Sequence, residues 1–280
     1  MRRPLLAVDG DSLAHRAYHA LPKTIRRDRG RHPAGAIIGF ANMLLRLWEN
    51  EQPRAVLVGW DTLDVPTYRH QAFDAYQSGR VFDDDLLEQL DLLPELVRRF
   101  GFAAAKAAGY EADDFLAAAV AKEEKRGGDT IVATSDRDLF QLASDRTTIL
   151  QPVRGVSELQ RIGPPEVRER YGVEPKQVPD FIALRGDPSD KLPGAPGVGA
   201  KTAAQILKTH GSLEDALGAG RFAAHAEELR LYRRIAALDA SAPLPPLRNQ
   251  TPAWAEASTF VRDELGLNAL AERLAAKARE

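Results

Sequence analysis

The chain has 280 residues, of which 44% are hydrophobic and 28% charged, with a formal net charge of −2 at pH 7 and no cysteine. This composition indicates a soluble globular protein of one large or two ordinary domains, and it excludes a disordered or membrane-spanning chain. The absence of cysteine excludes disulfides and thiolate metal sites, so a bound metal would have oxygen or histidine ligands.

Short apolar runs alternate with helical patterns through the first part of the chain. Strands buried on both faces of a sheet are predicted at residues 5–8, 55–60, 130–135 and 147–153. Apolar residues at helical spacing predict helices at residues 33–51, about 85–100 and 111–125. This alternation predicts a parallel, doubly wound α/β sheet.

The pattern changes after about residue 163. From there the sequence shows helical segments, the first opened by Pro164 and Pro165, and glycine-containing turns but no convincing strand. The N-terminus enters the first strand directly, which leaves no room for a signal peptide, and no apolar run is long enough to span a bilayer. We therefore expect a cytoplasmic protein without a membrane partner, with an α/β domain at residues 1–163 and an all-helical module at residues 164–280.

Three of the predicted strands end at an aspartate, namely Asp9, Asp61 and Asp136. Ligands of parallel sheets bind outside the carboxyl ends of the strands, so these acids should share one cleft with the acidic segments 111–114 and 186–190. So many anions need cations, and hard oxygen ligands suit Mg²⁺ or Mn²⁺. Two such ions clamp a phosphodiester, one generating the attacking hydroxide and the other stabilising the leaving oxygen.

Each acidic segment also has a simpler interpretation. An aspartate at a strand end often caps the next helix, and acids in a first helical turn favour the helix dipole. Residues 8–12 alone also fit the nucleophile motif of a haloacid-dehalogenase-type phosphatase, with Asp9 attacking phosphorus and Asp11 as the acid. Capping needs only one carboxylate, whereas Glu111, Asp113 and Asp114 lie within four residues, and metal ligation explains the excess.

The glycine-rich segment at residues 192–203 is the most specific local pattern. It is not a nucleotide-binding P-loop, because Ala200 separates Gly199 from Lys201. A glycine turn that leads into a helix leaves N–H groups free, and these suit a backbone phosphate of DNA. An ordinary tight turn between packed helices is the alternative, but it does not require Gly, Pro and Lys together. The DNA-binding residues expected here are Gly194, Gly197, Gly199, Lys201 and Thr202.

Taken together, these residues resemble the bacterial 5′-nuclease family, the flap endonuclease and 5′→3′ exonuclease group that includes the N-terminal domain of DNA polymerase I. The matching segments follow one another in the family's order over most of the chain. They are residues 5–10, 16–21, 60–61, 68–70, 109–114, 134–139 and 186–190, the last leading into the glycine turn. The chain resembles a freestanding member of the family, because it stops where a polymerase would begin.

The resemblance implies a PIN-like parallel-sheet nuclease domain with a helical arch at about residues 62–100, through which a 5′ strand threads. It places the glycine turn in a helix–three-turn–helix module that grips duplex DNA and holds K⁺. It further implies two or more Mg²⁺ or Mn²⁺ ions and a monomer, associated with the bacterial nucleoid, that acts in replication and repair on DNA with a 5′ flap, 5′ overhang or nick. The metal ligands that it implies are Asp9, Asp61, Glu111, Asp113, Asp114, Asp136, Asp138, Asp187 and Asp190.

The resemblance also implies roles for residues around the acids. Arg69 would contact the scissile phosphate, with Arg16 as a second candidate, and Arg80 would bind DNA. Tyr18 and Tyr76 would stack on unpaired bases, with core packing as an equal alternative for both rings.

Two positions depart from the family pattern. Gln77 stands where the family usually has a lysine, and Lys191 stands where it usually has an asparagine. A missing cation beside the scissile phosphate would slow cleavage unless Arg69 or Arg80 compensates. These departures motivate one rival interpretation, a structure-specific DNA-binding protein with weakened catalysis. The other rivals are a PIN-type ribonuclease and the phosphatase built on Asp9 and Asp11.

Overall fold

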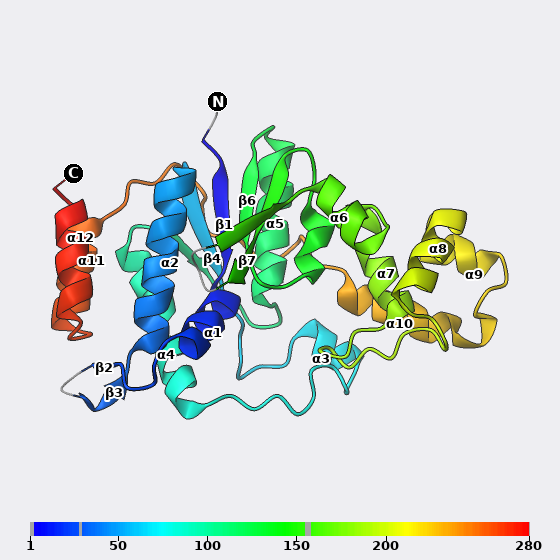
Figure 1. Cartoon of the computed structure of the whole chain (residues 1–280), viewed down its shortest axis with the longest axis horizontal. Helices are drawn as coiled ribbons and strands as arrows, with labels where there is room; N and C mark the ends of the chain where they lie inside the picture. Colours follow the sequence, from blue (N-terminus) through cyan, green and yellow to red (C-terminus); the bar gives the residue numbers. More distant parts are fainter. Residues whose placement is uncertain (1–2, 28–29, 155–157, 280) are drawn as a thin grey trace.

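The computed structural model describes residues 3–27, 30–154 and 158–279. Its centre is a six-stranded sheet in the order β5-β4-β1-β6-β7-β8 (Figure 1). A separate two-stranded hairpin pairs β2 with β3. The strands are β1 (Leu5–Asp9), β2 (Arg26–Arg27), β3 (His32–Pro33), β4 (Ala55–Gly59), β5 (Ala103–Ala105), β6 (Thr130–Ala133), β7 (Thr147–Arg154) and β8 (Glu158–Ile162).

The large sheet is parallel except at one edge, where β8 runs antiparallel to β7. The predicted parallel α/β sheet is thus confirmed, while the antiparallel β8 and the short β5 go beyond the prediction. In the register, Asp9 at the end of β1 lies beside Gly59 at the end of β4, and Val8 lies beside Ala133 at the end of β6. The carboxyl ends of the three central strands therefore meet at one edge of the sheet.

Helices cover both faces of the sheet (Figure 1). In this part of the chain they are α1 (Gly10–Ala20), α2 (Gly35–Glu51), α4 (Asp84–Arg99) and α5 (Ala112–Lys125), whereas the short α3 (Tyr68–Ala72) lies beyond the strand ends. Leu6 and Val8 point to the face covered by α1, α2 and α4, whereas Leu5 and Leu57 point to the face covered by α5. Successive strand side chains alternate between faces, so a strand covered on both sides needs an unbroken apolar run.

The predicted arch at residues 62–100 needs a correction at its C-terminal part. Residues 84–99 form α4, whose apolar side chains Leu86, Leu93 and Val97 are buried in the core of the α/β layer. This amphipathic helix cannot leave the core to surround a strand without exposing that face. The remaining residues, 62–83, contain only the short α3 and otherwise run as turns and extended chain across the strand ends (Figure 1).

A helical region follows β8 and extends to one side of the sheet (Figure 1). The short 3₁₀ helices η3 (Pro175–Gln177) and η4 (Ala223–His225) lie in this region, whereas η2 (Asp138–Leu142) precedes β7. The α-helices are α6 (Pro164–Tyr171), α7 (Val178–Arg185), α8 (Ala200–His210), α9 (Leu213–Gly218) and α10 (Ala226–Ala236).

The last two helices, α11 (Trp254–Asp263) and α12 (Asn268–Lys277), return to the α/β layer. Trp254 packs edge-on against Trp48 of α2, and Leu270 and Leu274 belong to the same apolar core as α2 and α4. The predicted helical module at residues 164–280 is therefore divided in space, because α11 and α12 pack on the layer formed by α2 and α4 instead. Within the described residues, no helix is long and apolar enough to cross a membrane.

Candidate active site

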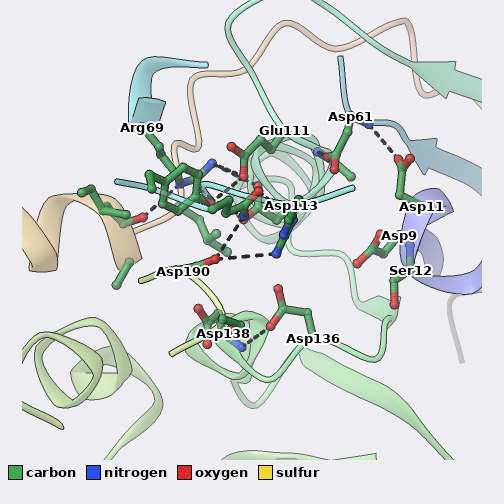
Figure 2. A pocket seen from close by; sticks show the side chains of 18 of the residues that line it. Asp9, Asp11, Ser12, Asp61, Arg69, Glu111, Asp113, Asp136, Asp138 and Asp190 are labelled. Carbon is green, nitrogen blue, oxygen red and sulfur yellow. Dashed lines mark hydrogen bonds and ion pairs between the residues drawn. The ribbon is translucent and has the colours of Figure 1, made fainter. Parts of the chain in front are cut away.

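A cavity of about 400 Å³ lies at the carboxyl ends of β1, β4 and β6 and is lined largely by carboxylates (Figure 2). Segments far apart in the sequence supply them: the strand ends, the start of α5, the turn before η2, and the loop after α7. The acidic lining residues are Asp9, Asp11, Asp61, Glu111, Asp113, Asp136, Asp138 and Asp190.

Asp9 and Asp61 are fixed by the strands that precede them. Asp9 caps α1: its Oδ1 accepts the Ser12 N–H at 3.0 Å, and its Oδ2 accepts the Thr134 hydroxyl at 2.7 Å. The Oδ1 of Asp61 accepts the N–H of Ala112, at the start of α5, at 2.7 Å. The capping interpretation and the site interpretation therefore both apply to Asp9.

Asp11 is a lining residue that the sequence analysis considered only as a phosphatase acid. It lies in the first turn of α1, is 8% exposed, and its Oδ2 accepts the N–H of Asp61 at 2.8 Å. It thus connects the end of β1 to the end of β4. Its position two residues after a strand-terminal aspartate was the signal that could have placed it in the metal cleft.

The start of α5 is organised by Arg69 of α3. Its guanidinium is 1% exposed and contacts Asp114 at 2.9 and 3.0 Å, Asp113 at 3.2 and 3.4 Å and Glu111 at 3.2 Å. Its Nε donates to the carbonyl oxygen of Ile235 in α10 at 2.9 Å. The arginine predicted to contact the scissile phosphate is therefore occupied by carboxylates and by the backbone of α10.

Asp114 differs from the other acids of its segment because it does not line the cavity. It is fully buried, and its oxygens accept the Glu111 N–H at 3.1 Å, the Asp239 N–H at 2.8 Å and the Tyr68 hydroxyl at 3.2 Å. These contacts hold the chain that returns from the helical region, so Asp114 has a structural function in this arrangement.

The acids on the opposite side of the cavity belong to the turn after β6 and the loop after α7. Asp136 accepts the Asp138 N–H at 2.9 Å. Asp190 accepts from the amide of Gln77 at 3.1 Å. Asp187 lies just outside the lining, where its carboxylate contacts Arg185 at 3.1 Å and the N–H of Ser189 at 2.8 Å.

Burial and mutual repulsion raise the pKa values of these acids. Burial first, then neighbouring carboxylates, raise the pKa of Asp9 to about 7, and burial raises those of Asp61 and Asp190 to about 6. The pKa values of Asp11, Asp113 and Asp138 lie well above the ordinary range, with burial as the main cause. Such clusters are stable as anions only with a cation nearby, so the donor set fits a divalent metal.

The carboxylates are at present engaged with N–H groups, hydroxyls and Arg69. Within the part of the chain that the structure describes, no three acidic or histidine side chains already converge into one metal-binding group.

The predicted DNA-contacting side chains divide into exposed and buried ones. Tyr18 is 5% exposed and Tyr76 3% exposed, so neither ring has an open face for a base, and core packing describes both. The Tyr76 hydroxyl also donates to Glu111 at 2.9 Å. Arg80 is exposed and lines the cavity, whereas Arg16 lies half-buried on α1 outside its lining.

The glycine turn contains two kinds of glycine. Gly194, with φ of 77°, lies against Gly186, and a Cβ there would approach the Gly186 nitrogen to 2.4 Å, so this glycine serves close backbone packing. Gly197, with φ of 73°, and Gly199 have open space around them, and Gly199 caps α8 without a side-chain hydrogen bond. Lys201 and Thr202 follow on the exposed first turn of α8, which leaves its N-terminal N–H groups accessible to an anion.

Two family models match consecutive parts of the chain. The model described as 5′-3′ exonuclease, N-terminal resolvase-like domain matches residues 4–172. The model described as 5′-3′ exonuclease, C-terminal SAM fold matches residues 173–256.

Curated relatives include thermostable DNA polymerase I of Thermus thermophilus, 41% identical over 251 residues, which are 86% of this chain and 29% of that protein. DNA polymerase I of Mycobacterium tuberculosis is 43% identical over 210 residues, which are 75% of this chain and 23% of that protein. The chain thus spans less than a third of the length of these relatives.

Solved structures with the same fold include the T5 D15 protein co-crystallised with metal ions, with a TM-score of 0.71 and 18% identity over 98% of this chain and 99% of that one. A bacteriophage T5 D15 flap endonuclease in complex with DNA and metal ions gives a TM-score of 0.70 and 18% identity over 99% of this chain and 100% of that one. At this identity the likeness shows a shared fold.

Proposed function

Since the chain belongs to the 5′-3′ exonuclease family, we propose that it is a structure-specific 5′ nuclease that hydrolyses DNA phosphodiesters at 5′ flaps, 5′ overhangs and nicks. The observation that carries this proposal is the cavity at the strand ends, with its many carboxylates and an exposed arginine at its rim. The role in replication and repair, in the bacterial cytoplasm and at the nucleoid, is part of the same proposal.

The proposed cofactor is Mg²⁺ or Mn²⁺, in two or more ions. Such ions supply an activated water and stabilise the charge on the leaving oxygen. The cavity-lining acids would hold them, and Asp187, just outside the lining, would do so through water. Asp114 would act indirectly, by holding Arg69 and the start of α5. We also propose K⁺ at the glycine turn, as the family resemblance implies.

The proposed DNA contacts divide between two parts of the molecule. Arg80 would bind a phosphate of the substrate strand at the rim of the cavity, where opposite charge steers the polyanion past the acids. The N-terminus of α8, with Gly197, Gly199, Lys201 and Thr202, would bind the backbone of the duplex. Contacts of this kind fix position and not sequence, so substrate choice would follow DNA shape.

The test is cleavage of a 5′-labelled flap substrate in Mg²⁺ or Mn²⁺, with a matched RNA flap beside the DNA flap. Asp136→Asn keeps the oxygen that accepts the Asp138 N–H but removes a charge from the cavity, so cleavage should fall at least about 100-fold while duplex binding persists. The exposed Asp145→Asn is the control and should cleave normally. Absence of cleavage by the folded wild-type protein in both metals would refute the proposal, and preference for RNA would favour a ribonuclease.

A further inference from the structure

The acid cavity has two arginines in its lining, and only one is available to a substrate. All three guanidinium nitrogens of Arg69 have protein partners, and its side chain is 1% exposed. The side chain of Arg80 is 45% exposed and lines both the acid cavity and the adjoining cavity on the other side of residues 77–80. Arg80 is therefore an exposed cation that both cavities share.

Gln77 holds Arg80 in this place. Its Oε1 accepts from Arg80 Nη1 at 2.6 Å, while its Nε2 donates to Asp190 Oδ1 at 3.1 Å and to the Tyr76 hydroxyl at 2.7 Å. The direct distance from Arg80 to Asp190 is longer, 3.8 Å. Gln77 therefore links the exposed arginine to a half-buried acid of the loop after α7 and to a buried tyrosine of its own segment.

The amide group suits this position for a chemical reason. It donates through nitrogen to the anion and accepts through oxygen from the cation, so one side chain satisfies both neighbours. A lysine here has only donors: it would bind Asp190 but would repel Arg80. Gln77 also has a left-handed backbone, with φ of 48°, a conformation that costs energy outside glycine and persists when surrounding contacts fix it.

We propose that Gln77 is a positioning residue that holds Arg80 at the rim of the acid cavity, where Arg80 binds a phosphate of the substrate strand. The cation of this region is thereby supplied from residue 80 and not from residue 77. The inference rests on the proposed nuclease function, but its central claim concerns DNA binding and is measurable without cleavage.

The experiment is a double-mutant cycle with Gln77→Met, Arg80→Met and the double variant, read by fluorescence anisotropy of a 5′-flap DNA in EDTA. Loss of one charge-assisted contact with a phosphate predicts about tenfold weaker DNA binding for Arg80→Met. Gln77→Met should weaken binding about fivefold when Arg80 is present and less than about twofold when it is absent, because its effect acts through Arg80. Ser78→Ala, exposed on the same turn, is the matched control and should bind as wild type does.

Kinetics in Mg²⁺ or Mn²⁺ provide the second readout. Gln77→Met should raise KM by a similar factor and leave kcat within about twofold, because a rim contact is present in substrate and transition state alike. Additive effects in the cycle, or wild-type binding by Gln77→Met, would overturn the inference. A wild-type protein that binds the flap with the predicted coupling but does not cleave it would instead refute the proposed function alone.

Discussion

Replacing Arg69 by methionine should destabilise the protein strongly, because it leaves buried carboxylates without their cation. The guanidinium is 1% exposed and contacts three acids at 2.9 to 3.4 Å. Removing one partner of a buried ion pair lowers the free energy of unfolding by about 3–5 kcal/mol. Because Arg69 pairs with several acids, we expect a loss in the upper part of that range. Methionine keeps much of the volume, so the loss reports charge and hydrogen bonding more than packing.

The assay is urea unfolding followed by far-UV circular dichroism at neutral pH in EDTA. Mg²⁺ should stabilise Arg69→Met more than it stabilises the wild type, because in the variant the ion neutralises carboxylates that have lost their arginine partner. The control is Arg168→Met, which removes a half-exposed ion pair with Glu174 and should cost under about 1 kcal/mol. A loss below about 1 kcal/mol for Arg69→Met would refute the view that Arg69 holds the acidic cluster together.

Three further predictions follow from the site and the glycine turn. Because burial raises the pKa of Asp9 from 3.8 to about 7, its contribution to stability is present below about pH 4 and is lost as pH rises towards 7. The melting temperature in EDTA should therefore fall over this window; a constant melting temperature would contradict the prediction, and Mg²⁺ should reduce the fall. Gly194→Ala places a Cβ 2.4 Å from a backbone nitrogen and should lower the free energy of unfolding, measured by thermal unfolding, by more than about 2 kcal/mol. Gly197 has open space around it, so Gly197→Ala should lower it by about 1 kcal/mol, and equal losses would refute the packing role of Gly194. Asp11→Ala should weaken Mn²⁺ binding, measured by electron paramagnetic resonance, about tenfold. Asp11→Asn keeps the acceptor for the Asp61 N–H and should lose less affinity; equal losses would mean that the charge alone matters.

The central strands and the convergence of their aspartates were predictable because both follow from simple periodicities. A strand covered on both faces requires an unbroken apolar run, and parallel strands bring their carboxyl ends together. The edge strands lack that signal. β5 consists of three alanines with no β-branched residue, and β8 is a mostly exposed strand with Glu158, Gln160 and Arg161.

The partners of individual side chains were less predictable, because they depend on tertiary contacts. Arg69 lies far along the chain from Asp113 and from Ile235, and no local spacing indicates that the fold brings all three together. The burial of Tyr18 and Tyr76 likewise follows from helix packing and not from their segments. The same limit applies to α11 and α12, because no local pattern in these segments identifies the layer of α2 and α4 as their partner.

The return of the chain to the α/β layer after α10 makes the helical region an insertion with two covalent crossings. One crossing lies between β8 and α6, and the other lies where Asp239 and Ala242 contact the layer. The lobe is also held by packing, because Phe181 of α7 belongs to the same apolar core as Val132 and Ile149 of the sheet. The glycine turn and the loop carrying Asp190 belong to that one lobe, so any displacement of the lobe would move the proposed duplex contacts and one wall of the acid cavity together.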